Sequence, residues 1–260
     1  MLRRLTPLVL LLSLLSVESK SAPDVTDLLT PPELGPCAHY RPRIQHLTRI
    51  VNQTSVNQEI KRAIEEIEKI TRVVGSQCTE GTIPTLLRAR YAPDAEARII
   101  VEPAAAALCT IGEDLHVVDG YLATFQRAPD VYDGSLDHAL DVVFEHRGGL
   151  SEEQLDRLYR DLPGSLHRLS SPSHQCLVEL LYEVGASGQR TEDRPKMVPL
   201  LRRLNTQELA SHVLRVWSVE SPAGIGAAPN YPACEKMLRG ARRERHQNCQ
   251  RRNGLQVGTQ

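Results

Sequence analysis

The chain has 260 residues, of which 41% are hydrophobic, and a formal net charge of −1 at pH 7. This length and composition are sufficient for one large folded domain or two small ones. Because 4% of the residues are aromatic, the core must consist mainly of Leu, Ile, Val and Ala, and a surface that stacks sugars or bases is disfavoured.

The first 21 residues have the pattern of a signal peptide. Arg3 and Arg4 precede an apolar run from Leu5 to Leu15, and small residues follow at the spacing of a cleavage site. This run is too short for a bilayer core of about 30 Å, and no later segment is long enough, so we expect no membrane span. The mature protein is expected to be secreted, or to reside in the lumen of the secretory pathway.

The cysteines and a glycosylation sequon agree with this compartment. Six cysteines are an even set, which in an oxidising compartment predicts about three disulfides. The sequon begins at Asn52 and predicts an N-linked glycan there. The disulfide candidates are Cys37, Cys78, Cys109, Cys176, Cys234 and Cys249.

Helical periodicity begins after a Pro-rich segment. Residues 22–42 contain five prolines and are expected to form an extended lead-in to a helical domain over 43–220. Turn-forming residues at 52–55 interrupt the first apolar stripe, which resumes in the most regular helix of the chain. We expect Asn57 to cap the start of this second helix and Gly75 to end it.

The residue pattern in the rest of the helical domain predicts further helices and no strand. Pro103 is expected to divide the apolar segment 94–108 into two helices, because proline lacks the N–H that a helix interior requires. Ser151 and Gln154 have the spacing of a capping box, which predicts the start of another helix. The expected fold is therefore all-α, a disulfide-linked helical bundle of roughly eight or nine helices.

The spacing of the first two cysteines favours a helical hairpin. A single straight helix over 43–74 would be about 48 Å long, which would keep Cys37 and Cys78 too far apart for a disulfide. A reversal of the chain at 52–57 would bring the two cysteines together. We therefore favour the hairpin and the Cys37–Cys78 pair.

The pairing of the other four cysteines is less constrained. An intact helix would separate Cys234 from Cys249 by about 22 Å, so that pair would form only if the tail bends back. By elimination, Cys109 and Cys176 are candidates to bridge the middle of the chain. Six cysteines nevertheless allow 15 pairings, and the sequence does not choose among them.

The sequence contains no motif of a known catalytic or metal site. It has no HExxH, CxxC or GxSxG motif and no phosphate-binding glycine loop. We therefore assign no catalytic residue and expect no metal or cofactor. Asp137, His138 and Asp141 are the best candidates for an acid–base site, but a solvated helix face is the ordinary interpretation of such a cluster.

Charge is separated between the tail and the middle of the chain. A Gly/Pro/Ala linker over 221–232 is followed by a basic helical segment over 233–249 and a disordered tail over 250–260. Residues 234–254 contain seven basic and two acidic residues, whereas residues 113–161 contain twelve acidic and four basic ones. This separation predicts either a tail that docks on its own acidic body or two surfaces for partners.

Four cations of the basic segment share one helical face, because they lie three or four residues apart. In an exported protein this face suits sulfated glycans, acidic lipid headgroups or an acidic protein surface, whereas export makes nucleic acid an unexpected partner. An equally weighted alternative is that the cations neutralise the acidic middle of the fold. These anion-binding candidates are Lys236, Arg239, Arg242 and Arg243.

Together these features predict a secreted, non-enzymatic helical binding or interaction protein, and they indicate no known family. The expected partner is an extracellular protein, an apolar ligand in a groove between helices, or a sulfated glycan at the basic helix. One alternative is a secreted hydrolase with an unrecognised acid–base site. The other is a hormone-like precursor that is cleaved at dibasic pairs such as Arg242-Arg243 and Arg251-Arg252.

Overall fold

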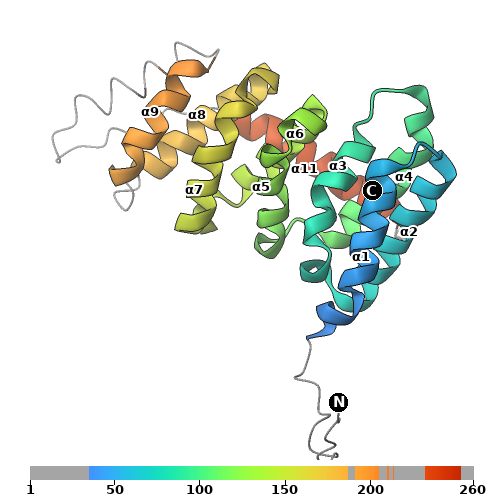
Figure 1. Cartoon of the computed structure of the whole chain (residues 1–260). Coiled ribbons are helices and arrows are strands. Elements are labelled where there is room, and N and C mark those ends of the chain that lie inside the picture. The colour runs from blue at the N-terminus through green and yellow to red at the C-terminus, as the bar shows by residue number, and fades with distance from the viewer. Residues whose placement is uncertain (1–34, 187–190, 205–209, 211–212, 214–231, 253–260) are drawn as a thin grey trace, which may run out of the picture. The chain divides into compact units, whose positions relative to one another are not determined.

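The computed structural model describes residues 35–186, 191–204, 210, 213 and 232–252 (Figure 1). Contacts divide the chain into two units, residues 1–35 and 36–260, and every helix described below belongs to the second unit. The described residues form ten α-helices and several 3-10 turns without any strand, which confirms the predicted all-α, disulfide-linked class. The helices are α1 (Pro36–Gln53), α2 (Asn57–Val74), α3 (Ile83–Arg90), α4 (Arg98–Ile111), α5 (Val118–Gln126), α6 (Asp133–Glu145), α7 (Glu152–Asp161), α8 (Ser171–Ala186), α9 (Arg194–Arg203) and α11 (Pro232–Arg252).

The structure describes only some of the residues for which we made predictions at the two ends of the chain. The signal peptide over 1–21 and nearly all of the linker over 221–232 lie outside the described residues. Helix α11 contains the predicted basic segment 233–249 and continues to Arg252, so the start of the tail predicted as disordered over 250–260 is helical. None of the helices that the structure describes combines the length and the apolar character that a membrane span requires.

Helices α1 and α2 form the predicted hairpin. The chain reverses between Gln53 and Asn57, and the apolar stripes of the two helices meet in the core, where Leu47 and Ile64 are at most 1% exposed. A disulfide joins Cys37 to Cys78 with 5.0 Å between the Cα atoms. This confirms the predicted pair and closes the open end of the hairpin.

Helix α1 begins earlier than the sequence indicated. It starts at Pro36 rather than Arg43, so the extended conformation predicted for the end of the 22–42 lead-in is wrong. Pro42 lies inside the helix, where it removes one backbone hydrogen bond. The disulfide at Cys37 fixes the first turn, and Tyr40 packs on the core, which together compensate for that bond.

The ends of α2 follow from local contacts. Val56 is the N-cap residue, so the prediction that Asn57 caps the helix is wrong. The amide of Asn57 instead donates a hydrogen bond to Oε2 of Glu96 at 2.7 Å. Gly75 ends the helix as predicted, with a φ of +91° that glycine adopts without strain.

Helix α4 continues through Pro103, so the predicted division of this segment is wrong. The proline forfeits one hydrogen bond, to the carbonyl four residues earlier. The same helix buries Ile100, Ala104 and Ala107 where it packs along α2 and α3. Burial of this whole face outweighs the loss of a single backbone bond.

Beyond α4 the core continues through successive helix contacts, from α3 to α5, from α5 to α6 and α7, and from α6 to α8. Two glycines permit close approach in this region. A Cβ atom at Gly120 would lie 2.5 Å from the carbonyl oxygen of Glu80, and one at Gly134 would lie 2.6 Å from the ring of Tyr91. These glycines therefore bring α5 and α6 close to the residues around α3.

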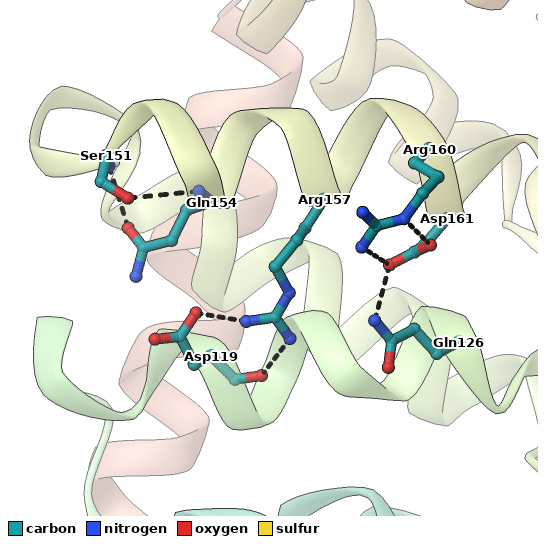
Figure 2. A network of polar contacts seen from close by, with 7 residues as sticks. All are labelled: Asp119, Gln126, Ser151, Gln154, Arg157, Arg160 and Asp161. Atoms are coloured by element: carbon teal, nitrogen blue, oxygen red, sulfur yellow. Dashed lines mark hydrogen bonds and ion pairs between the residues drawn. The ribbon is translucent and has the colours of Figure 1, made fainter.

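Helix α7 starts at the predicted capping box (Figure 2). Ser151 Oγ accepts a hydrogen bond from the backbone N–H of Gln154 at 3.2 Å, and Gln154 Oε1 accepts one from the backbone N–H of Ser151 at 3.0 Å. The two bonds satisfy N–H groups that have no partner inside the helix.

Polar side chains fasten α7 to α5 (Figure 2). Arg157 donates from Nη1 to Oδ1 of Asp119 at 2.6 Å and from Nη2 to its backbone oxygen at 3.2 Å. Gln126 Nε2 donates to Oδ2 of Asp161 at 2.9 Å. Burial alone would raise the pKa of the Asp161 carboxyl, but hydrogen bonds from Arg160 and Gln126 lower it overall.

Helix α11 is tied to the rest of the protein near both of its ends. Cys234 pairs with Cys176 of α8, and Cys249 pairs with Cys109 of α4. The suggested Cys109–Cys176 bridge is therefore wrong, whereas the expectation that Cys234 and Cys249 do not pair with each other is confirmed. Elimination failed because it treated the tail separately from the body, while α11 packs against α8 and α4 (Figure 1).

Candidate functional site along helix α11

A groove of about 770 Å³ lies between α11 and the helices it packs against, and we call it the α11 groove. Arginines of α11 line one side. The turn after α4 and the end of α6 line the other. The lining residues are Arg90, Leu108, Cys109, Gly112, Glu113, Asp114, Glu145, His146, Arg239, Arg242, Arg243, His246 and Cys249.

The basic wall of the groove consists of Arg239, Arg242 and Arg243, three of the four predicted anion-binding residues. The fourth, Lys236, is exposed one turn earlier on α11 and does not line the groove. All three arginines are also exposed. Among the residues that the structure describes, neither Arg242 nor Arg243 has an ion-pair partner.

The acidic wall consists of Glu113, Asp114 and Glu145. Gly112, with a φ of +82°, ends α4 and turns the chain toward the first two of these residues. At the end of α6, His146 Nε2 forms a hydrogen bond with the backbone oxygen of Glu113, which joins the two segments of this wall. The basic tail therefore docks beside acidic residues of its own body, which was one of the two predicted arrangements.

His138 is buried behind the acidic wall, so a solvated helix face is the wrong interpretation at this position. It is 4% exposed, and its Nδ1 atom lies 3.0 Å from the hydroxyl of Tyr91. Its Nε2 atom lies 3.5 Å from Oε1 of Glu113, and the ring of Tyr121 stacks on the imidazole with centroids 5.9 Å apart. The imidazole thus supports the acidic wall from inside the fold.

The acid–base candidates of α6 do not converge on one cleft. Asp137 Oδ1 accepts a hydrogen bond from the backbone N–H of Ser170 at 3.0 Å, so this carboxylate serves the start of α8 rather than His138. Asp141 is half-buried on the same helix. Throughout the described ranges, no three His, Cys, Asp or Glu side chains are arranged to hold a metal ion.

The other predicted site residues lie elsewhere. All six cysteines are paired, as described above. Asn52 lies in the last turn of α1, where it lines a second and smaller hollow.

The sequence analysis did not predict which residues outside α11 line the α11 groove. The charge separation indicated an acidic counterpart somewhere in residues 113–161, but which of those acids line the groove depends on the two disulfides and the contacts that place α11. The residues missed are Arg90, Glu113, Asp114 and His246.

Comparison of the chain with protein-family models, with curated proteins and with solved structures finds no match.

Proposed function

We propose that this protein is an extracellular, non-enzymatic binding protein that holds a sulfated glycan along the exposed arginines of α11. One observation carries the proposal. Arg242 and Arg243 line a groove of about 770 Å³, are exposed, and have no ion-pair partner among the described residues. Guanidinium groups in this state are available to bind sulfate or carboxylate groups in a bidentate manner.

The proposed compartment is supported by the disulfides. No cysteine is free, and two of the three bonds join segments that are far apart in the sequence. Disulfides of this kind persist in oxidising environments and are rare where thiols are kept reduced. The predicted signal peptide over 1–21 and secretion of the mature chain are part of the same proposal.

The charged lining of the groove disfavours an apolar ligand. Nine of its thirteen lining residues are Arg, Asp, Glu or His, whereas sites for apolar ligands are lined mainly by hydrophobic and aromatic side chains. The acidic wall would repel an anion that entered the groove deeply. An anionic polymer is therefore expected to lie along the exposed edge of α11, where Lys236 to Arg243 cover about 10 Å.

The two alternatives receive less support. A hydrolase would need accessible acid–base groups, and His138 is enclosed by Tyr91 and Tyr121. A hormone-like peptide released by cleavage at Arg242-Arg243 would come from α11. Cleavage after Arg243 would leave the two halves of the helix attached to the body through Cys234 and Cys249.

The test is retention on immobilised heparin of protein purified from the culture medium of eukaryotic cells. We expect the Arg242→Gln/Arg243→Gln variant to bind about tenfold more weakly and to depend less steeply on salt, because two cationic contacts are lost. The matched control is Arg202→Gln/Arg203→Gln, a pair of consecutive arginines on α9 that are also exposed. Equal losses in the two variants, unchanged retention in the first, or failure of the protein to reach the medium would contradict the proposal.

A further inference from the structure

Asn52, the first residue of the sequon, borders a hollow of about 320 Å³. Its amide is half-buried and is held by one partner. Nδ2 donates to Thr85 Oγ1 at 3.2 Å, and Thr85 Oγ1 lies 3.3 Å from Oδ1, to which it donates in turn. The hollow is lined by Asn52, Pro84, Thr85, Arg88, Arg127, Asp130 and Val131.

We propose that Asn52 carries an N-linked glycan whose first N-acetylglucosamine residue occupies this hollow, which we call the Asn52 hollow. The inference rests on the proposed function in one respect, since glycosylation requires passage through the secretory pathway. In the transfer, Nδ2 forms a bond to C1 of the sugar and releases one proton. The bond from C1 to the diphosphate of a lipid-linked oligosaccharide donor breaks, and the lipid diphosphate leaves.

The size and chemistry of the Asn52 hollow suit a single sugar. Sites that hold small ligands begin at roughly 300 Å³. Arg88 and Arg127 offer donors for the ring substituents, and Asp130 offers acceptors for hydroxyl groups. Pro84 and Val131 supply an apolar surface for the acetyl methyl group.

A sugar on Nδ2 would occupy the space beside the Asn52 amide in which Thr85 now lies. In a glycosylated asparagine the sugar takes the amide position on the side of Oδ1, which is the side that Thr85 occupies. Glycosylation therefore replaces the bond from Nδ2 to Thr85 and turns the amide toward the hollow.

Because Asn52 is synthesised before Thr85, the glycan can be attached before the hydrogen bonds between these two residues form. Thr85 lies 33 residues after Asn52, so the sequon enters the lumen before α3 is complete and can pack against α1. The sugar is then present when the hollow forms. It contacts α1, α3 and the 3-10 turn Ala128–Asp130, and links three segments that are separate in the sequence.

The first measurement is the intact mass of the secreted protein before and after treatment with peptide N-glycosidase. We expect the loss of one glycan from the wild-type chain and no change in the Asn52→Gln variant. A secreted protein without this glycan would overturn the inference and leave heparin binding unaffected. A protein that is not secreted would instead contradict the proposed compartment.

The second measurement tests whether the sugar occupies the hollow. Protein bearing high-mannose glycans is trimmed with an endoglycosidase that leaves one N-acetylglucosamine, and its melting temperature is compared with that of the Asn52→Asp variant, because complete enzymatic removal converts the asparagine to aspartate. We expect the single sugar to raise the melting temperature by about 3 °C.

An arginine variant then separates occupancy of the hollow from a general effect of glycosylation. In Arg127→Ala the stabilisation by the single sugar should fall by at least half, whereas it should persist in the control Arg49→Ala, which removes an exposed cation of α1 outside the hollow. Equal stabilisation in both variants, or no stabilisation in the wild type, would overturn the assignment of the hollow.

Discussion

Disulfides constrain both the α1–α2 hairpin and helix α11, but different interactions hold the two in place. The hairpin buries a continuous apolar stripe, and its disulfide joins residues 41 positions apart. Of the α11 side chains that the structure describes, Cys234 alone is buried, and Cys249 bonds to a cysteine 140 positions earlier. Core packing therefore holds the hairpin, with the disulfide as an addition, whereas we expect α11 to depend more on the two disulfides that attach it.

This difference predicts that removal of the Cys109–Cys249 disulfide causes the largest loss of unfolding free energy. The Cys109→Ser/Cys249→Ser variant should lose up to about 5 kcal/mol of unfolding free energy, because the bond closes a very long loop. The second half of α11 should also lose protection against amide hydrogen exchange, since none of its described side chains is buried. Denaturant titration and hydrogen-exchange mass spectrometry measure the two effects.

The hairpin provides the comparison for that experiment. The Cys37→Ser/Cys78→Ser variant should also be less stable, but amides of α1 and α2 should stay protected under native conditions because Leu47 and Ile64 remain packed. If α11 kept its protection without Cys109–Cys249 while the hairpin lost its own, the proposed division between packing and disulfides would be wrong.

A somewhat smaller effect is expected from the core of the hairpin itself. Ile67 of α2 is fully buried, and Ile67→Ala should reduce the unfolding free energy by about 3 kcal/mol through lost burial and a residual cavity. Val73 on the same helix is 71% exposed, so Val73→Ala should change it by less than about 0.5 kcal/mol. Urea titrations of the two variants make this comparison, and similar losses would count against a packing-dominated hairpin.

The smallest effect concerns Glu80, which lies in the 3-10 turn Glu80–Thr82 between the hairpin and α3. Burial and the nearby Asp119 carboxylate raise the pKa of Glu80, although Arg157 opposes the shift. The ionised form is therefore disfavoured in the folded protein. Glu80→Gln should raise the melting temperature at pH 7 by about 1–2 °C.

The pH dependence of that gain checks its cause. As the pH falls through the raised folded-state pKa of Glu80 toward the pKa of the unfolded chain, the wild-type carboxyl becomes protonated and the difference between the proteins should disappear. A gain that persisted at pH 3 would show that packing, rather than charge, distinguishes the variant from the wild type.

The sequence predicted those features that depend on neighbouring residues. The isoleucine stripe of α2, the stop at Gly75 and the capping box at Ser151 are set by spacing within a few turns. The Cys37–Cys78 pair followed from the geometry of one hairpin. Local rules failed where burial outweighs them, as at Pro103, which α4 tolerates because its neighbours pack on α2 and α3.

Of the residues that line the α11 groove, the sequence predicted only the arginines of α11 as a binding surface. The arginines of α11 stand out because they recur at helical spacing, whereas the facing acids come from the ends of α4 and α6, which the sequence gives no reason to join. Their meeting depends on where α8 and α4 place Cys176 and Cys109. That placement is a property of the whole packed array and cannot be obtained from any single segment.

The bond between Cys109 and Cys249 has a consequence for biosynthesis. Cys109 is synthesised 140 residues before Cys249, and Cys176 is synthesised 58 residues before Cys234, so both thiols lack their native partners during part of synthesis. Each thiol can meanwhile form a non-native pair, which must be exchanged before the last helix can be attached. Oxidative maturation should therefore proceed through isomers that a disulfide isomerase resolves, with the native bond to Cys249 formed after synthesis of α11.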